Sequence, residues 1–411
     1  GTVVKTAVES SGPARHSSPA MVGEGESASA SSFSDDRLDA AFRPAPNSAP
    51  ARWIGMGSNL GHELRPRLLS DPGEPSHPYV PLQLPGMKDA WDPRVVEDSA
   101  IFWDVPFSGG SVALDVMRSC HRLKTTGMRG NYEIHDGETE LKIVYPGRAP
   151  PGRDRTPFIN VDTSTVPGIS RARQLGLGQS SIADVIVTPL VYESDTLFSE
   201  DHPARGRLFA IFRHPIERAA DLFYYMKHAH WEPTYTPEVA AMSIDQYAKS
   251  NLVEDNWMTR QLSGQLSGEL TQDHLTAALE VLRTKFLVGL HDHLGESMDR
   301  FDRYFGWTFR MNPANQEQCR NVFIKRGVAI DGGGGHGAGK KHKELEEGTE
   351  AFEAIFWHNQ MDLEIYDYAV MLFKEQVEFV AETPENFRTV GATCCRCNPP
   401  TFPQGFECPQ Q

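Results

Sequence analysis

The stretch that decides the fold is Arg207-Leu-Phe-Ala-Ile-Phe-Arg213-His-Pro215-Ile-Glu-Arg218-Ala-Ala-Asp221-Leu-Phe-Tyr-Tyr225. Residues 208–212 form an apolar run typical of a buried strand, and Pro215 opens a helical pattern of apolar residues. The stretch therefore predicts a strand that leads directly into a helix N-terminus, with an arginine at the junction. Free N–H groups at a helix N-terminus bind anions, and the arginine fork suits phosphate. We interpret this junction as a phosphate site.

Strand and helix patterns alternate along the rest of the central region. Apolar runs predict further strands at 100–105, 141–145, 158–161, 183–188 and 286–290. Helical spacing of apolar residues marks 112–120, 168–177, 216–230, 243–251, 274–284, 291–305 and 349–373. This alternation predicts an α/β fold, a three-layer sandwich in which helices cover both faces of a central parallel sheet.

Composition divides the chain into four parts. Residues 1–50 are rich in Ser, Ala, Gly and Pro and carry few large apolar residues, so we expect a disordered segment. Residues 51–97 form a Pro-rich, irregular lead-in with scattered apolar anchors, and 98–380 form the α/β domain. Residues 381–411 form a tail that contains Cys394, Cys395, Cys397 and Cys408.

Charge and cysteine content exclude several classes of protein. A net charge of −15 over 411 residues argues against a nucleic-acid binder. The tail cysteines have no histidine nearby at the spacing of a zinc site, which favours disulfides or free thiols and predicts no metal. Cys120 and Cys319 lie in the body of the domain. No apolar run reaches the ~18 residues of a membrane span.

A glycine-rich turn follows the first predicted strand of the domain. The sequence Pro106-Phe107-Ser108-Gly109-Gly110-Ser111 separates the run at 100–105 from the helical pattern at 112–120. Glycines let backbone N–H groups approach a phosphate closely, and ligands of open α/β sheets bind at the carboxyl ends of strands. We therefore expect Ser108, Gly109, Gly110 and Ser111 to form a second phosphate-binding element beside Arg213.

These two motifs resemble those of sulfotransferases that use 3′-phosphoadenosine 5′-phosphosulfate (PAPS). Arg213 matches the family's 3′-phosphate arginine, and the turn at 106–111 resembles its 5′-phosphosulfate loop. Two positions depart from the family: Phe107 replaces a lysine of the loop, and Asp221 replaces a serine. Further segments at 256–264, 286–290 and 359–366 resemble Golgi-type carbohydrate sulfotransferases, and 231–235 is similar to algal and diatom relatives.

The resemblance implies a P-loop-like fold shared with nucleotide kinases, and PAPS as co-substrate without a metal. It implies transfer of a sulfonate group to a hydroxyl of a carbohydrate or similar acceptor. Lys340 and Lys341, in the Gly-rich loop at 331–343, would fold over the nucleotide, and Glu133 or His135 would act as the base. It also implies a Golgi-lumen enzyme with its membrane anchor upstream of Gly1. We expect any protein partners to bind through the N-terminal segment and the tail.

The two departures leave two main hypotheses open. One is an active sulfotransferase. The other is a catalytically silent relative that serves as a binding or structural subunit, because Phe107 offers no donor and Asp221 brings a carboxylate near a phosphate. Asp221 could pair with Arg218 or with Arg213, and pairing with Arg213 would partly occupy the phosphate anchor. Asp221 facing solvent or Arg218 would favour activity, and Asp221 facing the 108–111 turn would favour silence. A different nucleotide-binding transferase or kinase is disfavoured because no Gly-x-x-x-x-Gly-Lys-(Ser/Thr) motif is present. For Asn256, Arg260 and Asp362, a role in bracing helices competes with a role in the site.

Overall fold

The structure is a computed structural model, and it describes residues 84–126, 137–145, 156–199, 202–230, 235–307, 313–330 and 345–381. The predicted disordered segment at 1–50 and nearly all of the tail at 381–411 lie outside these residues. Within the described ranges, no helix is both long and apolar enough to cross a membrane.

The core of the domain is a four-stranded parallel sheet. Its strands are β1 (Ser99–Trp103), β4 (Val185–Thr188), β5 (Gly206–Phe212) and β6 (Phe286–Leu290), in the order β4-β1-β5-β6. The register places Ile101 of β1 between Ile186 and Leu208 of its neighbours. The predicted α/β fold with a central parallel sheet is confirmed.

Two predicted strands lie elsewhere. The runs at 141–145 and 158–161 form only β2 (Ile143–Val144) and β3 (Phe158–Ile159), which pair with each other in antiparallel fashion. Both residues of β2 are half-buried, in contrast to the fully buried β4, β5 and β6. Strands buried on both faces are typical of parallel sheets, so the half-buried β2 fits a peripheral pair.

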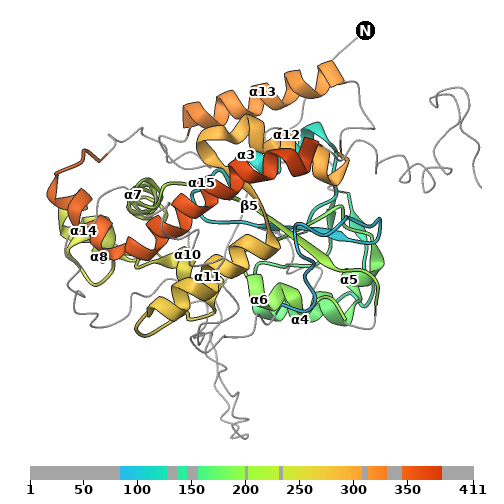
Figure 1. Cartoon of the computed structure of the whole chain (residues 1–411), viewed down its shortest axis with the longest axis horizontal. Helices are drawn as coiled ribbons and strands as arrows, with labels where there is room; N and C mark the ends of the chain where they lie inside the picture. The colour runs from blue at the N-terminus through green and yellow to red at the C-terminus, as the bar shows by residue number, and fades with distance from the viewer. Residues whose placement is uncertain are drawn as a thin grey trace, which may run out of the picture. The chain divides into compact units, whose positions relative to one another are not determined.

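Helices cover both faces of the parallel sheet (Figure 1). In chain order, the helices of the described residues are α3 (Gly110–Asp115), the π-helix η1 (Val116–Cys120), α4 (Val166–Gln174), α5 (Leu177–Ser180), α6 (Val191–Asp195), α7 (Pro215–Met226), α8 (Pro237–Ala241), α9 (Ile244–Ala248), α10 (Trp257–Ser263), α11 (Gln272–Lys285), the 3₁₀-helix η3 (His291–His293), α12 (Leu294–Phe305), α13 (Pro313–Ile330), α14 (Glu350–His358) and α15 (Gln360–Ala381). Of these, α8, α9 and α14 pack against α7 in a third apolar cluster that contains no residue of the sheet. The helix predicted at 349–373 is interrupted at Asn359, whose backbone leaves the helical region. The prediction lacked α5, α6, α8, α10 and α13.

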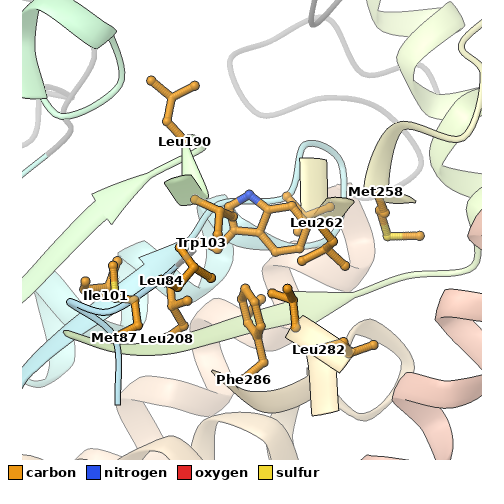
Figure 2. Packing of buried hydrophobic residues seen from close by; sticks show 14 of the residues in the cluster. Leu84, Met87, Ile101, Trp103, Leu190, Leu208, Met258, Leu262, Leu282 and Phe286 are labelled. Carbon is orange, nitrogen blue, oxygen red and sulfur yellow. The ribbon is translucent and has the colours of Figure 1, made fainter. Parts of the chain in front are cut away.

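Alternate side chains of each strand enter two separate apolar cores. Ile101, Trp103 and Leu208 face a core shared with α4, α10, α11 and α15. Figure 2 shows Trp103 and Phe286 close together in this core; their ring centroids are 5.4 Å apart. Phe102 and Phe209 face the opposite core, which α3, η1 and α12 complete. This alternation gives the three predicted layers.

The segment before β1 is fastened to the domain by one buried arginine. Arg207, 1% exposed, binds the Asp98 carboxylate through Nε at 2.8 Å. Its two Nη atoms donate to the backbone carbonyls of Asp89, Asp92 and Pro93. Residues 84–98 of the predicted lead-in therefore pack on the sheet as part of its core.

Side chains close both edges of the sheet. At the β6 edge, the Gln376 amide accepts from Val288 N and donates to Phe286 O, both at 2.8 Å. At the β4 edge, Thr126 Oγ1 accepts from Val187 N at 3.0 Å, and Thr163 Oγ1 donates to Val187 O at 2.6 Å. Exposed strand edges promote aggregation, so these contacts remove a liability of an open sheet.

We expect Gln376→Ala to lower the free energy of unfolding by about 1–3 kcal/mol, because it leaves a buried N–H and a buried C=O without partners. Urea denaturation of the wild-type chain and the variant measures this change. Lys374→Ala, at an exposed position of the same helix, is the control and should change the free energy of unfolding by no more than about 0.5 kcal/mol. A Gln376→Ala variant as stable as the wild type would contradict the assignment.

Candidate functional site

The two predicted phosphate-binding elements lie side by side. β1 and β5 are neighbouring parallel strands, so the turn after β1 and Arg213 after β5 lie next to each other at the carboxyl ends of the strands. From β1 the chain continues to β4 on one side, and from β5 it continues to β6 on the other. Open α/β sheets bind ligands at such a switch point. The site therefore occupies the position that the fold favours for a ligand.

The turn after β1 is tightly folded and partly acidic. Gly109 adopts a left-handed φ of 89°, which favours glycine, and a Cβ at Gly110 would lie 1.9 Å from Asp104 Oδ1, so a side chain there would have to displace the Asp104 carboxylate. Phe107 also has a positive φ, 61°, which is unusual for a bulky residue. Ser111 is exposed, whereas Ser108 is 1% exposed and its hydroxyl has no hydrogen-bond partner among the described residues.

Arg213 is held by groups of the protein itself. Its Nη1 donates to Asp221 Oδ2 in a short ion pair and to the backbone carbonyl of Phe107 at 2.9 Å. Its Nε donates to Glu217 Oε2 at 3.3 Å. The side chain of Arg213 is 9% exposed and that of Asp221 is 11% exposed. The guanidinium therefore joins the turn after β1 to α7, and it faces two carboxylates.

The Phe107 side chain adds an apolar contact between the same two elements. Its ring packs edge-on against Tyr225 of α7, with ring centroids 5.3 Å apart. The two residues that depart from the family pattern thus act together. The Phe107 ring packs on α7, and the Phe107 backbone carbonyl accepts a hydrogen bond from Arg213. Asp221 forms an ion pair with the same arginine. Asp221 is directed to the arginine that holds the turn, and Arg218 binds Glu254 instead.

Polar side chains from β6 and α15 line the neighbouring part of this edge. The imidazole of His291, directly after β6, packs over Gly109, because a Cβ there would lie 3.1 Å from its Cδ2. Tyr366 of α15 packs edge-on against His214, with centroids 5.5 Å apart, and its hydroxyl lies 3.4 Å from Asp292 Oδ2. Burial, then the charges of Asp292 and Glu217, raise the pKa of Tyr366 to about 12. This phenol is therefore protonated at neutral pH and is not a base.

Asn256 and Asp362 have structural roles. The Asn256 side chain accepts from the N–H groups of Met361 and Asp362 at the start of α15. Asp362 in turn accepts from Met258 N and Thr259 N at the start of α10, at 2.8 and 2.7 Å. The N-termini of α10 and α15 therefore cap each other.

Arg260 has a structural role as well. It forms an ion pair with Asp255, donates through Nε to the backbone carbonyl of Asp255 before α10, and donates through Nη1 to the Gly268 carbonyl in the loop that follows α10. The interpretation that these polar residues brace helices is thus confirmed for Asn256, Arg260 and Asp362.

Four predicted site residues lie outside the described part of the chain. These are Glu133 and His135, proposed as the base, and Lys340 and Lys341, proposed to cover the nucleotide. The structure brings Ser108, Gly109, Gly110 and Ser111 together with Arg213, and it adds Glu217, Tyr225 and His291, which the sequence analysis did not select. The i,i+4 spacing of Arg213 and Glu217 was an available signal. Across the described ranges, no group of three or more His, Cys, Asp or Glu side chains could hold a metal ion.

Comparisons with known proteins include a likeness to a solved structure. No protein-family model matches the sequence, and no curated protein matches it. The chain is similar to the crystal structure of mouse sulfotransferase SULT7A1 complexed with PAP, with 12% sequence identity and a TM-score of 0.32. The match covers 75% of this chain and 92% of the mouse chain. The sheet and the site described above define the chain as an α/β protein with a parallel sheet. A turn that contains glycines lies beside an arginine at the carboxyl ends of the strands of this sheet.

Proposed function

We propose that this chain is a sulfotransferase-like protein that serves as a binding or structural subunit and does not transfer sulfonate. The observation that carries the proposal is the ion pair between Asp221 and Arg213 at the edge shared by β1 and β5. In the resemblance to PAPS-dependent enzymes, Arg213 is the anchor of the nucleotide 3′-phosphate. Here the single positive charge of Arg213 faces the carboxylates of both Asp221 and Glu217.

A nucleotide phosphate would have to displace Asp221. Because Asp221 is 11% exposed, displacement would leave a nearly buried carboxylate beside the incoming dianion. Breaking a buried ion pair costs about 3–5 kcal/mol, which corresponds to a loss of roughly 10²–10⁴-fold in affinity. The turn offers no compensating cation, since Phe107 occupies the lysine position. The donor set of the described residues therefore does not fit PAPS.

The competing function is a PAPS-dependent sulfotransferase that acts on a carbohydrate hydroxyl. The position of Arg213 and the Gly109 turn at the switch point supports it, because a phosphate-binding site would be built there. Titration calorimetry of the full chain with 3′,5′-adenosine bisphosphate distinguishes the two. We expect no heat of binding at millimolar nucleotide. Micromolar binding that disappears in Arg213→Ala would overturn the silent assignment and lead to a screen of acceptors.

We also propose that the protein works in an oxidising compartment, in keeping with the Golgi lumen that the resemblance implies. The disulfide between Cys120 and Cys319 supports this proposal, since such bonds persist in secretory compartments and are rare in the cytosol.

A further inference from the structure

Helix α13 lies on the outside of the helical layer that covers one face of the sheet. It packs on α12, α3 and η1, and Figure 1 shows it beyond α12 and α3, away from β5. It is 18 residues long. Of its described side chains, Cys319, Phe323 and Ile324 contact the apolar core only partly, and Val322 is 60% exposed. Over 314–325, the part of α13 whose side chains are described, the apolar contact with the core is therefore small.

A disulfide adds a covalent attachment. Cys319 of α13 is bonded to Cys120, the last residue of η1, which is fully buried. The two cysteines are 199 residues apart in sequence, so the bond ties α13 to an element at the start of the domain. Cys319 is half-buried, which leaves this end of the bond within reach of a small thiol.

A buried polar network surrounds the disulfide. His121, adjacent to Cys120, places Nδ1 3.2 Å from the Gln316 amide and Nε2 2.9 Å from Asp302 Oδ1. Arg320 binds Asp302 at 3.3 Å and also pairs with Asp299. The His121 and Asp302 side chains are 0% and 2% exposed. The His121–Asp302 pair joins the residue after η1 to α12, whereas the contacts of Gln316 and Arg320 belong to α13 and exist only while α13 is seated.

We propose that the Cys120–Cys319 disulfide is a redox latch: its reduction by a dithiol releases α13 while the parallel sheet stays folded. One thiolate of the dithiol attacks the Cys319 sulfur, forms a mixed disulfide and expels the Cys120 thiolate. The second thiol of the reagent then closes the reagent's own disulfide and frees Cys319. Two electrons pass from the dithiol to the protein, and the two protein thiolates take up two protons from water.

The size of the effect follows from the chain that would become mobile. With the sheet folded, the bond closes a loop of roughly 15 residues, from Phe305 at the end of α12 to Cys319. A crosslink over a loop of that length favours the closed state by about 100-fold in the opening equilibrium. Release of α13 would expose His121 and Asp302 to solvent. This inference does not depend on the proposed function.

Hydrogen-exchange mass spectrometry of the full chain tests the latch in three states: oxidised, reduced with dithiothreitol, and Cys319→Ala. In the reduced chain and in Cys319→Ala, we expect backbone amide exchange in 313–330 to rise about 100-fold. The amides of 206–212 and 286–290 should stay protected in both. Adding dithiothreitol to Cys319→Ala is the control for the tail cysteines and should change nothing in α13. Unchanged protection of α13 after reduction, or loss of protection in β5 together with α13, would overturn the proposal.

Discussion

A double variant, Phe107→Lys with Asp221→Ser, is expected to bind 3′,5′-adenosine bisphosphate in the micromolar range, where the wild-type chain gives no measurable binding. The serine removes the carboxylate that occupies Arg213, and the lysine supplies a cation to the turn after β1. A hydrogen bond to a charged group contributes about 1.5–3 kcal/mol, so two such gains amount to roughly 10²–10⁴-fold in affinity. Titration calorimetry measures it.

The single variants separate the two contributions. Asp221→Ser alone should release Arg213 and give weak binding, whereas Phe107→Lys alone should give little, because Asp221 still holds the arginine. Arg213→Ala in the double-variant background is the matched control and should abolish binding. If the double variant folds like the wild type and still fails to bind, the turn itself does not accept a phosphate, and the likeness to a nucleotide site is one of architecture only.

The strand and turn elements of this site could be predicted from sequence because they depend on local patterns. The apolar run of β5, Arg213 at its end and Pro215 at the helix start fix a strand–helix junction without reference to any other segment. The parallel order β4-β1-β5-β6 then brings the turn after β1 next to it. Short apolar runs do not specify a partner, however, which is why β2 and β3 pair apart from the main sheet.

The choice between the possible ion pairs of the site could not be predicted in the same way. The sequence left Asp221 to pair either with Arg218, three residues earlier, or with Arg213. In the structure Arg218 binds Glu254, 36 residues away, and this leaves Asp221 to Arg213. The contact between Arg218 of α7 and Glu254, in the segment before α10, thus decides which arginine pairs with Asp221. The attachment of α13 rests likewise on contacts made across most of the domain, above all the bond between Cys120 and Cys319.

Arg218→Met is expected to lower the free energy of unfolding by about 3–5 kcal/mol, the usual cost of removing one partner of a buried ionic group. Arg218 is fully buried, forms a two-pronged ion pair with Glu254, and has Asp362 Oδ2 4.0 Å from its Nη2. Its guanidinium also lies over the Trp257 ring, 5.3 Å from the centroid. Without the arginine, two carboxylates would share this interior without a cation. Lys249→Met breaks the exposed pair with Glu350 and is the matched control, for which we expect a change within about 0.5 kcal/mol.

The pH dependence distinguishes a lost charge from lost packing. Burial raises the pKa of both Glu254 and Asp362, and Arg218 opposes that rise. Removing Arg218 should therefore raise both pKa values further, so the folded variant binds protons more tightly than its unfolded chain does. A group with a raised folded-state pKa loses its stabilising contribution as pH rises through that value. The stability gap between the wild type and Arg218→Met should accordingly shrink as pH falls from 7 to 5. A gap that is constant over this range in urea denaturation would mean that Arg218 stabilises the interior through its volume and its contact with Trp257, and that Glu254 and Asp362 are already protonated at neutral pH.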